Sequence, residues 1–471
     1  MSPTRTQKAA LLILLAVALF LRLGYAFSQD HLAPYDRQQG GDTWWYLEYG
    51  YRLVTGIESA PLPTAPLYPV IVGGLRLLFQ SPTTDLVLLP ASPGGGLDVY
   101  SVAGAPVAAV VVLLRVLQAL AATSTVYFAY RIVRALTQRI TPALIVAAVL
   151  ATAVALIVST AEVQTETFYI FFLAAALMLY TDLTASHITY RQPLLWLAVC
   201  GGLLALATLT RAVLLLFPLG LLLHALLLRY RDVPTQATLR GVTLLLAVYI
   251  ALNSLWTFYY YNQWGQVIVG AQGLSAFFYL GTQSEVPPPA QIDEDLGASD
   301  QNPIGADDFN AQATRSITTA PLAYLSLRAQ NLLSAYAQPY GTNAFGGPSL
   351  RALTTDWLRT DRTPSGLLAL TRAPAFWPKL LIYLVHYGGL LLALIGLWRG
   401  RRRWPLILPL AGLILYVTLL HLALLALPRY IFPLLPFWWS LAPLAFIRPS
   451  VHPHPPKSKT PGQSRASANT P

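Results

Sequence analysis

The amino-acid sequence predicts an all-α polytopic membrane protein. Of its 471 residues, 55% are hydrophobic and only 11% are charged, whereas soluble domains carry roughly 25% charged residues. Apolar runs of about 17–25 residues recur along the chain, and each can cross a hydrocarbon core roughly 30 Å thick. Because backbone groups in hydrocarbon must pair within their own segment, we expect these runs to be helices.

About ten spanning helices are predicted from these runs. They cover residues 8–26, 103–129, 140–160, 165–181, 193–210, 212–228, 238–257, 377–398, 404–421 and 430–447. The first run resembles a signal peptide, because Arg5 and Lys8 precede an apolar stretch. No small-residue cleavage site follows it cleanly, so we interpret it as a retained first span.

The charge of the loops predicts the orientation of the spans. Basic residues gather at the two termini and near 131–139, 191, 229–240 and 399–403. Asp182 and Asp232 are the only acidic residues on the side of the membrane that these loops share. Cytoplasmic loops are rich in Lys and Arg, so we predict that both termini are cytoplasmic. The net charge of +11 arises from these loops. Since no basic groove with stacking aromatics is present, nucleic acid is not expected as a partner.

Four regions follow from the placement of the spans. Residues 1–257 form an N-terminal transmembrane module that includes a long external loop at 27–102. Residues 258–376 form an external loop or small subdomain, and 377–447 form the C-terminal transmembrane helices. Residues 448–471 are rich in Pro, Ser and Lys and are predicted to be a disordered cytoplasmic tail.

The loop at 27–102 is predicted to contain helices that lie in the membrane interface. Residues 43–55 can form a short helix that is rich in Trp and Tyr, and such side chains favour the headgroup region. The proline-rich stretch 61–69 then leads into a second apolar run at 70–80. Residues 90–96 have the composition of a loose turn.

Asp42 is the leading candidate for a catalytic base. It follows Gly40 and Gly41 on the predicted external face, so a substrate hydroxyl can approach its carboxylate. A positioned base of this kind accelerates a reaction about 10²–10⁴-fold. The alternative is an ordinary loop acid or the N-cap of the 43–55 helix. Asp36 is a competing candidate for the same role.

Two glutamates mark the turn between the third and fourth predicted spans. Glu162 and Glu166 are four residues apart, so on a helix they would share one face. Like charges at that distance repel unless a cation, a metal or a substrate hydroxyl lies between them. Ionisable groups at a membrane are costly and indicate a functional site, although the pair is also compatible with the wet end of a helical hairpin.

Two arginines are predicted on the same external face. Arg211 separates two uncharged runs, and Arg429 lies at the mouth of the last span beside Tyr430. A guanidinium can hold a lipid phosphate through paired hydrogen bonds, so we predict that Arg211, Arg429 and Tyr430 bind substrate. The alternative for both arginines is a side chain that snorkels to the headgroups.

Other polar residues within the spans suggest no cofactor. Arg22 and Arg115 need partners that the sequence does not identify, and His386 is interpreted as a hydrogen-bonded core histidine. Cys200 is the single cysteine, so an intramolecular disulfide is impossible. Neither zinc-type spacing nor a nucleotide fingerprint stands out. We expect no nucleotide cofactor, assign no metal ligands, and leave a divalent-metal requirement open.

Four motifs, taken in order, resemble the integral-membrane glycosyltransferases of the C-type fold that use polyprenyl-phosphate sugars. The first loop, 41–47 with Pro66-Leu67-Tyr68-Pro69, is followed by 165–169, by 202–211 and by Pro428-Arg429-Tyr430 with Pro433 and Pro436. The chain is similar in particular to bacterial relatives of protein O-mannosyltransferases and of the lipid A aminoarabinose transferase. The resemblance implies a multi-pass protein of the plasma membrane, which is the bacterial inner membrane, with its active site on the external face.

The resemblance also implies roles for individual residues. Asp42 would deprotonate the acceptor, Arg211 would hold the donor phosphate with help from Arg429, and Glu166 would orient hydroxyl groups. Many relatives have paired acids in the first loop, whereas Thr43 follows Asp42 in this chain. Because the second acid of the pair is missing, the assignment of Asp42 as the base rests on a motif that matches the relatives only in part.

Our hypothesis from the sequence is a hexosyl- or pentosyltransferase that moves a sugar from a polyprenyl-phosphate donor to an acceptor hydroxyl with inversion. The acceptor is a protein, a lipid or a polysaccharide, and membrane lipids are further partners. The alternatives are a flippase or exporter of lipid-linked glycans and a glycan polymerase. A carrier lines a midplane path with polar groups, whereas the ionisable residues here crowd one predicted surface.

Overall fold

The computed structural model describes residues 4–31, 42–56, 64–79, 105–185, 187–271, 274–283 and 306–447. Within these ranges the chain is helical and contains no strand, which confirms the predicted fold class. Three predicted features lie outside the described residues. They are the turn at 90–96, residues 284–305 of the predicted external loop at 258–376, and the tail at 448–471.

Eight helices within the described ranges are long and apolar enough to span a membrane. They are α1 (Arg5–Ser28), α5 (Ala105–Thr137), α8 (Glu166–Thr184), α9 (Pro193–Thr210), α10 (Phe217–Tyr230) with the preceding turn η2 (Ala212–Leu214), α11 (Leu239–Trp264), α18 (Phe376–Arg399) and α19 (Trp404–Ala423). Each matches a predicted span, although α5 and α11 continue beyond the predicted ends. The chain is therefore a multi-pass membrane protein, and its orientation and membrane remain predictions.

The predicted span at 140–160 is instead divided into α6 (Ile140–Ala151) and α7 (Val154–Val158). The last carbonyls of a helix have no partner within the helix. The buried guanidinium of Arg22 donates to the Leu150 and Ala151 carbonyls, each at 3.0 Å, and thereby satisfies the end of α6. The partners of Arg22, which the sequence did not identify, are therefore the carbonyls at the point where the predicted span is interrupted.

The predicted span at 430–447 is also interrupted. It consists of α20 (Pro428–Ile431), η5 (Phe432–Leu434), α21 (Leu435–Leu441) and η6 (Ala442–Ala445). Proline has no backbone N–H and its ring clashes with the preceding turn, so Pro433, Pro436 and Pro443 keep this segment in short pieces. The sequence prediction of one continuous helix was wrong here.

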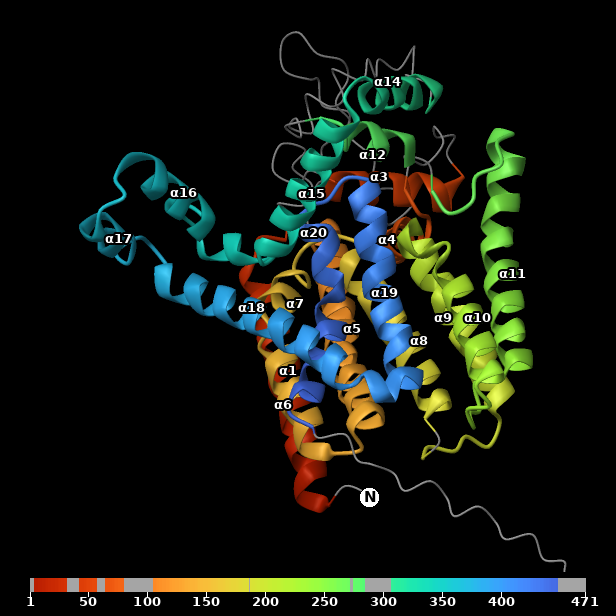
Figure 1. Ribbon diagram of the computed structural model, residues 1–471. Helices are drawn as coiled ribbons and strands as arrows, with labels where there is room; N and C mark the ends of the chain where they lie inside the picture. The colour runs from red at the N-terminus through yellow and green to blue at the C-terminus, as the bar shows by residue number, and fades with distance from the viewer. Residues whose placement is uncertain are drawn as a thin grey trace, which may run out of the picture.

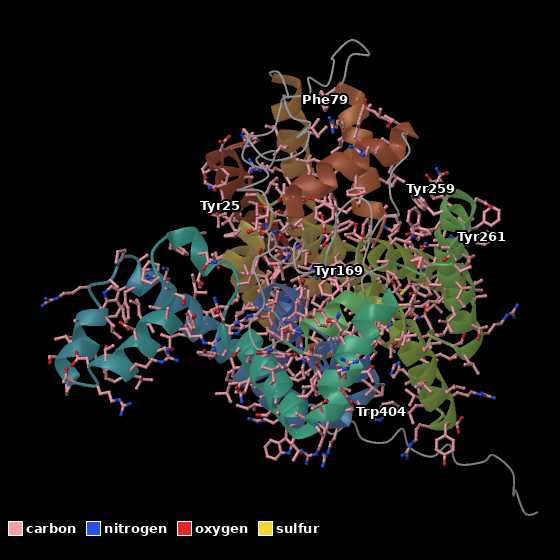
Figure 2. The ribbon with its side chains drawn as sticks, turned by 90° about the horizontal axis from the view of Figure 1, so that it is seen from above. Tyr25, Phe79, Tyr169, Tyr259, Tyr261 and Trp404 are labelled. Atoms are coloured by element: carbon pink, nitrogen blue, oxygen red, sulfur yellow. The ribbon has the colours of Figure 1, made fainter. Side chains whose placement is uncertain are left out.

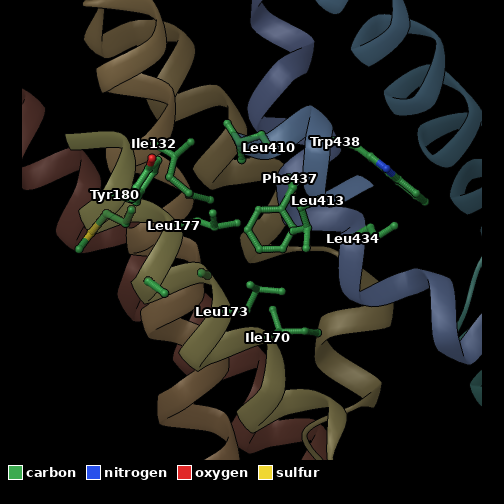
Figure 3. Close-up of a cluster of buried hydrophobic side chains, with 14 of the residues drawn as sticks. Ile132, Ile170, Leu173, Leu177, Tyr180, Leu410, Leu413, Leu434, Phe437 and Trp438 are labelled. Carbon is green, nitrogen blue, oxygen red and sulfur yellow. The ribbon is translucent and has the colours of Figure 1, made fainter. Parts of the chain in front are cut away.

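Helix α8 lies at the centre of the bundle. Of its apolar stretch 89% is buried, compared with 22% for α18. Leu173 and Leu177 of α8 pack in the same buried cluster as Leu413 of α19 and Phe437 of α21 (Figure 3). The first residue of α8 is Glu166, so the fold places this carboxylate at the end of the most enclosed helix.

The two segments predicted to be external meet at one end of the bundle. Helices α3 (Asp42–Thr55), α12 (Leu274–Leu280), α14 (Ala306–Thr319) and α15 (Pro321–Ala337) gather at the end opposite the start of α1, and α4 (Leu67–Phe79) lies beside α3 (Figure 1). The turn η3 (Thr342–Phe345) follows α15, and α16 (Leu350–Thr360) and α17 (Pro364–Leu370) extend to one side. Helices α3 and α4 correspond to the two predicted interfacial elements.

Helices α3 and α4 cross at a pair of glycines. A Cβ atom on Gly73 would lie 1.9 Å from the Gly50 carbonyl oxygen, and one on Gly50 would lie 2.3 Å from the Pro69 carbonyl oxygen. Both obstacles are backbone atoms, which cannot turn aside as a long side chain can. The crossing therefore requires glycine at both positions.

Replacing Gly73 by alanine should force α3 away from α4. We expect a loss of about 1–3 kcal/mol of stability, as in other overpacked contacts, measured by thermal denaturation in detergent. Gly74→Ala is the matched control, because a Cβ atom at Gly74 would meet nothing within 4 Å and alanine favours helix. Equal melting temperatures for the two variants would contradict the crossing geometry.

Candidate functional site

One carboxylate oxygen joins two arginines from distant parts of the chain. Oε1 of Glu166 accepts a hydrogen bond from Nη1 of Arg211 at 2.7 Å and from Nε of Arg429 at 2.6 Å. The Glu166 side chain is 1% exposed, whereas Arg211 and Arg429 are 16% and 23% exposed. The carboxylate is thus enclosed, and the two guanidinium groups, called the arginine pair below, reach toward solvent.

Three helix ends bring these residues together. Glu166 lies in the first turn of α8, where the helix dipole favours a negative charge. Arg211 has an extended backbone, with φ −147°, that ends α9 before η2. Arg429 follows Pro428 at the start of α20. Pro428, which opens α20 just before the last predicted span, therefore presents one member of the arginine pair.

Aromatic rings hold the Arg211 guanidinium in place. It lies 5.8 Å from the ring centroid of Tyr169 and 5.1 Å from that of Tyr430, and both distances permit a cation–π attraction. Seen from above, Tyr169 lies near the middle of the bundle, whereas Tyr259 is at its edge (Figure 2). The ring of Tyr430 also contacts His421, with centroids 5.6 Å apart. Tyr430 therefore packs between the Arg211 guanidinium and His421.

Glu162 lies in the turn before α8 and not on a helix, so the expected shared helical face was wrong. Helix α7 ends at Val158 and α8 begins only at Glu166. The Tyr340 hydroxyl donates a hydrogen bond to the Glu162 carboxylate. Burial raises the pKa of Glu162, and the neighbouring Glu166 raises it further, against the opposing effects of Tyr340 and Arg429. The two acids are close in space, as predicted, and each has its own partner.

A buried amide connects helix α4 with this turn. The Tyr68 hydroxyl donates to Gln118 Oε1 at 2.8 Å, and Gln118 Nε2 donates to the carbonyls of Thr160 at 3.0 Å and Glu162 at 2.8 Å. Tyr46 of α3 packs edge-on against Tyr68, with ring centroids 5.0 Å apart. The first segment predicted to be external is therefore attached directly to the Glu162 turn.

The structure does not describe the side chains of the two aspartates that were predicted as bases. Asp42 begins α3, four residues before the buried Tyr46, and its side chain lies outside the described part of the structure. Asp36 lies entirely outside the described residues. The structure brings together Glu162, Glu166 and the arginine pair, while both aspartates remain predictions.

Sequence reasoning missed several residues of the site. Tyr340 lies in no motif, and Tyr169 ends the 165–169 motif but was not singled out as a site residue. Gln118 did carry a signal, because an amide in an apolar run must find a partner within the protein. Arg115 has a similar structural role, since its Nε donates to the Ala161 carbonyl at 2.8 Å. His386 is half-buried and hydrogen-bonded to the Tyr336 carbonyl at 2.7 Å, which confirms the predicted hydrogen bond.

The cluster has the chemistry of an anion site. Two guanidinium charges face a single bridging carboxylate, and the raised pKa of Glu162 favours the neutral form of the second acid. A guanidinium has five N–H donors in a fixed fork, and the Glu166 contact of Arg211 engages one nitrogen. Within the described ranges no group of three or more His, Cys, Asp or Glu side chains is arranged to hold a metal ion.

Searches of protein-family models and of curated proteins gave no match to the chain. Among solved structures the chain is similar to the oligosaccharyltransferase of Archaeoglobus fulgidus. The apo crystal structure is 15% identical with a TM-score of 0.47, and the alignment covers 93% of this chain and 50% of the other. The form tethered with an acceptor peptide is 14% identical with a TM-score of 0.48, covering 93% and 49%.

A third structure of the archaeal enzyme, in complex with an inhibitory peptide and a dolichol-phosphate, is 16% identical with a TM-score of 0.45 and covers 94% and 50%. This chain therefore spans about half the length of the proteins that it matches. These values assign neither a family nor an activity to the chain.

Proposed function

We propose that the protein is a membrane glycosyltransferase that transfers a sugar from a polyprenyl-phosphate donor to an acceptor hydroxyl with inversion. The Glu166 carboxylate that binds the arginine pair carries this proposal, because it fixes two cations at the end of apolar helices. A ligand with a phosphate at the headgroups and a chain in the bilayer matches that placement. Relatives of protein O-mannosyltransferases and of the aminoarabinose transferase supply the sugar classes to test first.

In the proposed reaction the arginine pair binds the donor phosphate. Asp42 takes the proton of the acceptor hydroxyl, and the hydroxyl oxygen forms a bond to the anomeric carbon. The bond from that carbon to the phosphate oxygen breaks, and polyprenyl phosphate leaves with the electron pair. The leaving phosphate gains negative charge, and fixed cations stabilise this charge best where water is scarce.

The resemblance implies that Glu166 orients substrate hydroxyl groups, whereas its contacts favour a different role. Its Oε1 is already shared by the arginine pair, and the Thr165 hydroxyl lies 3.4 Å from Oε2. We therefore propose that Glu166 orients the guanidinium groups and leaves the sugar hydroxyls to other residues. A carrier would distribute such charges along a path through the midplane, whereas this cluster lies at helix ends.

Arg211→Gln tests the proposal directly. In liposomes that contain purified protein and a polyprenyl-phosphate sugar, release of polyprenyl phosphate should fall about 10²-fold, the lower range for loss of one charge-stabilising donor, because Arg429 remains. Arg240→Gln is the control, since Arg240 is an exposed arginine in the first turn of α11. Normal release by a folded Arg211→Gln variant would contradict the proposed phosphate site.

A further inference from the structure

An apolar cavity adjoins the charged cluster. Its volume is about 290 Å³, and residues of α7, α15, α18 and the segment from α20 to α21 line it. The ribbons of α7, α15, α18 and α20 lie close together in Figure 1. On the inner side Ala335, Ile431 and Trp438 are 2%, 1% and 3% exposed. On the outer side Leu381 and Val385 are 62% and 42% exposed. The cavity therefore has a packed inner wall and opens beside the lipid-facing surface of α18.

Three of the polar side chains in the cavity wall, those of His386, Thr152 and Tyr340, are hydrogen-bonded within the protein. Nε2 of His386 is hydrogen-bonded to the Tyr336 carbonyl, and the Thr152 hydroxyl donates to the Ala148 carbonyl at 3.1 Å. The Tyr340 hydroxyl donates to Glu162. What these residues offer to an occupant is mainly carbon surface, so the cavity is suited to a hydrocarbon chain.

Two residues connect the cavity with the arginine pair. Tyr340 lines the cavity with its ring, which stacks on Phe432 with centroids 4.4 Å apart and planes at 6°, while its hydroxyl reaches Glu162. Pro428 also lines the cavity and directly precedes Arg429. An amphipathic ligand can thus place an anionic head at the arginine pair and its chain in the cavity.

We propose that this cavity binds the isoprenoid segment next to the phosphate of the lipid donor. The inference rests on the proposed function for the identity of the head group. The volume is near the lower limit of the roughly 300–1,000 Å³ found for small-molecule sites, so the cavity takes the first units of the chain and leaves the rest in the bilayer. The exposed outer wall at Leu381 and Val385 allows the chain to enter from the side.

Cavity-filling variants test this proposal in a transfer assay. Two donors with the same sugar are compared, one on farnesyl phosphate and one on a long polyprenyl phosphate. Ile382→Trp and Val385→Trp should raise the KM of both donors about tenfold or more, because each buried methylene contributes roughly fourfold to binding. Leu384→Trp is the control, since Leu384 is on the same helix, is 60% exposed and lies outside the cavity wall. Unchanged KM values in both filled variants would overturn the proposal.

Photo-crosslinking separates this inference from the proposed transfer reaction. A polyprenyl phosphate with a diazirine in its first isoprene unit should label the peptides of α18 and α21, and Val385→Trp should reduce that labelling while Leu384→Trp should not. Labelling confined to other helices would overturn the cavity assignment even if transfer is observed. Labelling that phosphatidylglycerol removes but free polyprenyl phosphate does not would likewise overturn it. Labelling in α18 and α21 without transfer from any sugar donor would support the cavity and contradict the proposed function.

Discussion

Glu166→Gln is expected to lower both the stability of the protein and its transfer rate. Glutamine keeps the shape of the side chain but removes the charge that the arginine pair shares at 2.7 and 2.6 Å. Removing one partner of a buried ion pair costs about 3–5 kcal/mol. We expect about 3 kcal/mol, because the arginines are partly exposed and water reaches their charges. Without the carboxylate the guanidinium groups repel each other, so transfer should fall about 10²-fold.

Asp182→Asn is a matched control at the other end of the same helix. Asp182 is buried and accepts a hydrogen bond from Arg131 at 2.5 Å and from the Tyr190 hydroxyl at 3.0 Å. It lies about 24 Å from Glu166 at the rise of an α-helix. This variant should lose stability to a similar degree, yet each folded molecule should transfer sugar at the normal rate. Equal losses of specific activity in both variants would reduce Glu166 to a purely structural role.

A double variant tests whether Glu166 and Arg429 act as a pair. Glu166→Gln with Arg429→Gln removes one positive charge along with the negative charge, so one guanidinium remains instead of two. Contacting residues show coupling energies of about 0.5–3 kcal/mol, and the double variant should therefore lose less stability than the two single losses added together. Additive losses in thermal denaturation would show that the two side chains do not interact in solution.

The fold was predictable from the sequence wherever a long apolar run sets it. Helices α9 and α18 agree closely with the predicted spans because hydrocarbon allows few alternatives to a helix. The apolar runs at 140–160 and 430–447 did not reveal that their helices are interrupted. Their interruptions depend on Arg22, which comes from a helix more than one hundred residues away, and on closely spaced prolines whose effect depends on the packing around them.

Several residues of the site could be predicted from the sequence, but the contacts between them could not. Arg211 and Arg429 were recognisable because each is a lone charge at the edge of an apolar run. Nothing in their spacing of more than two hundred residues indicates that both donate to the same oxygen of Glu166. Tyr340 was missed for the same reason, since its pairing with Glu162 exists only once the segment after α15 is folded against the turn before α8.

Asp42→Asn is expected to abolish most transfer while leaving donor binding intact. Asparagine keeps the size of the side chain but cannot accept the proton of the acceptor hydroxyl, so kcat should fall about 10³-fold, within the usual contribution of a positioned base. Because we propose that the arginine pair and the cavity hold the donor, its KM should change little. Helix α3, which begins at Asp42, is attached to the Glu162 turn, because Tyr46 packs on Tyr68, whose hydroxyl is linked through Gln118 to the Glu162 carbonyl.

The competing aspartate makes the experiment decisive. Asp36→Asn removes an equivalent carboxyl six residues earlier, and on our proposal it should retain near-normal kcat in the same liposomes. If Asp36→Asn loses the rate and Asp42→Asn does not, the base is Asp36, and α3 serves only to close the site. If both folded variants turn over normally, the proton is taken by neither residue. Glu162 would then be the acid to test, since its carboxylate interacts with Arg429 of the arginine pair and accepts a hydrogen bond from Tyr340.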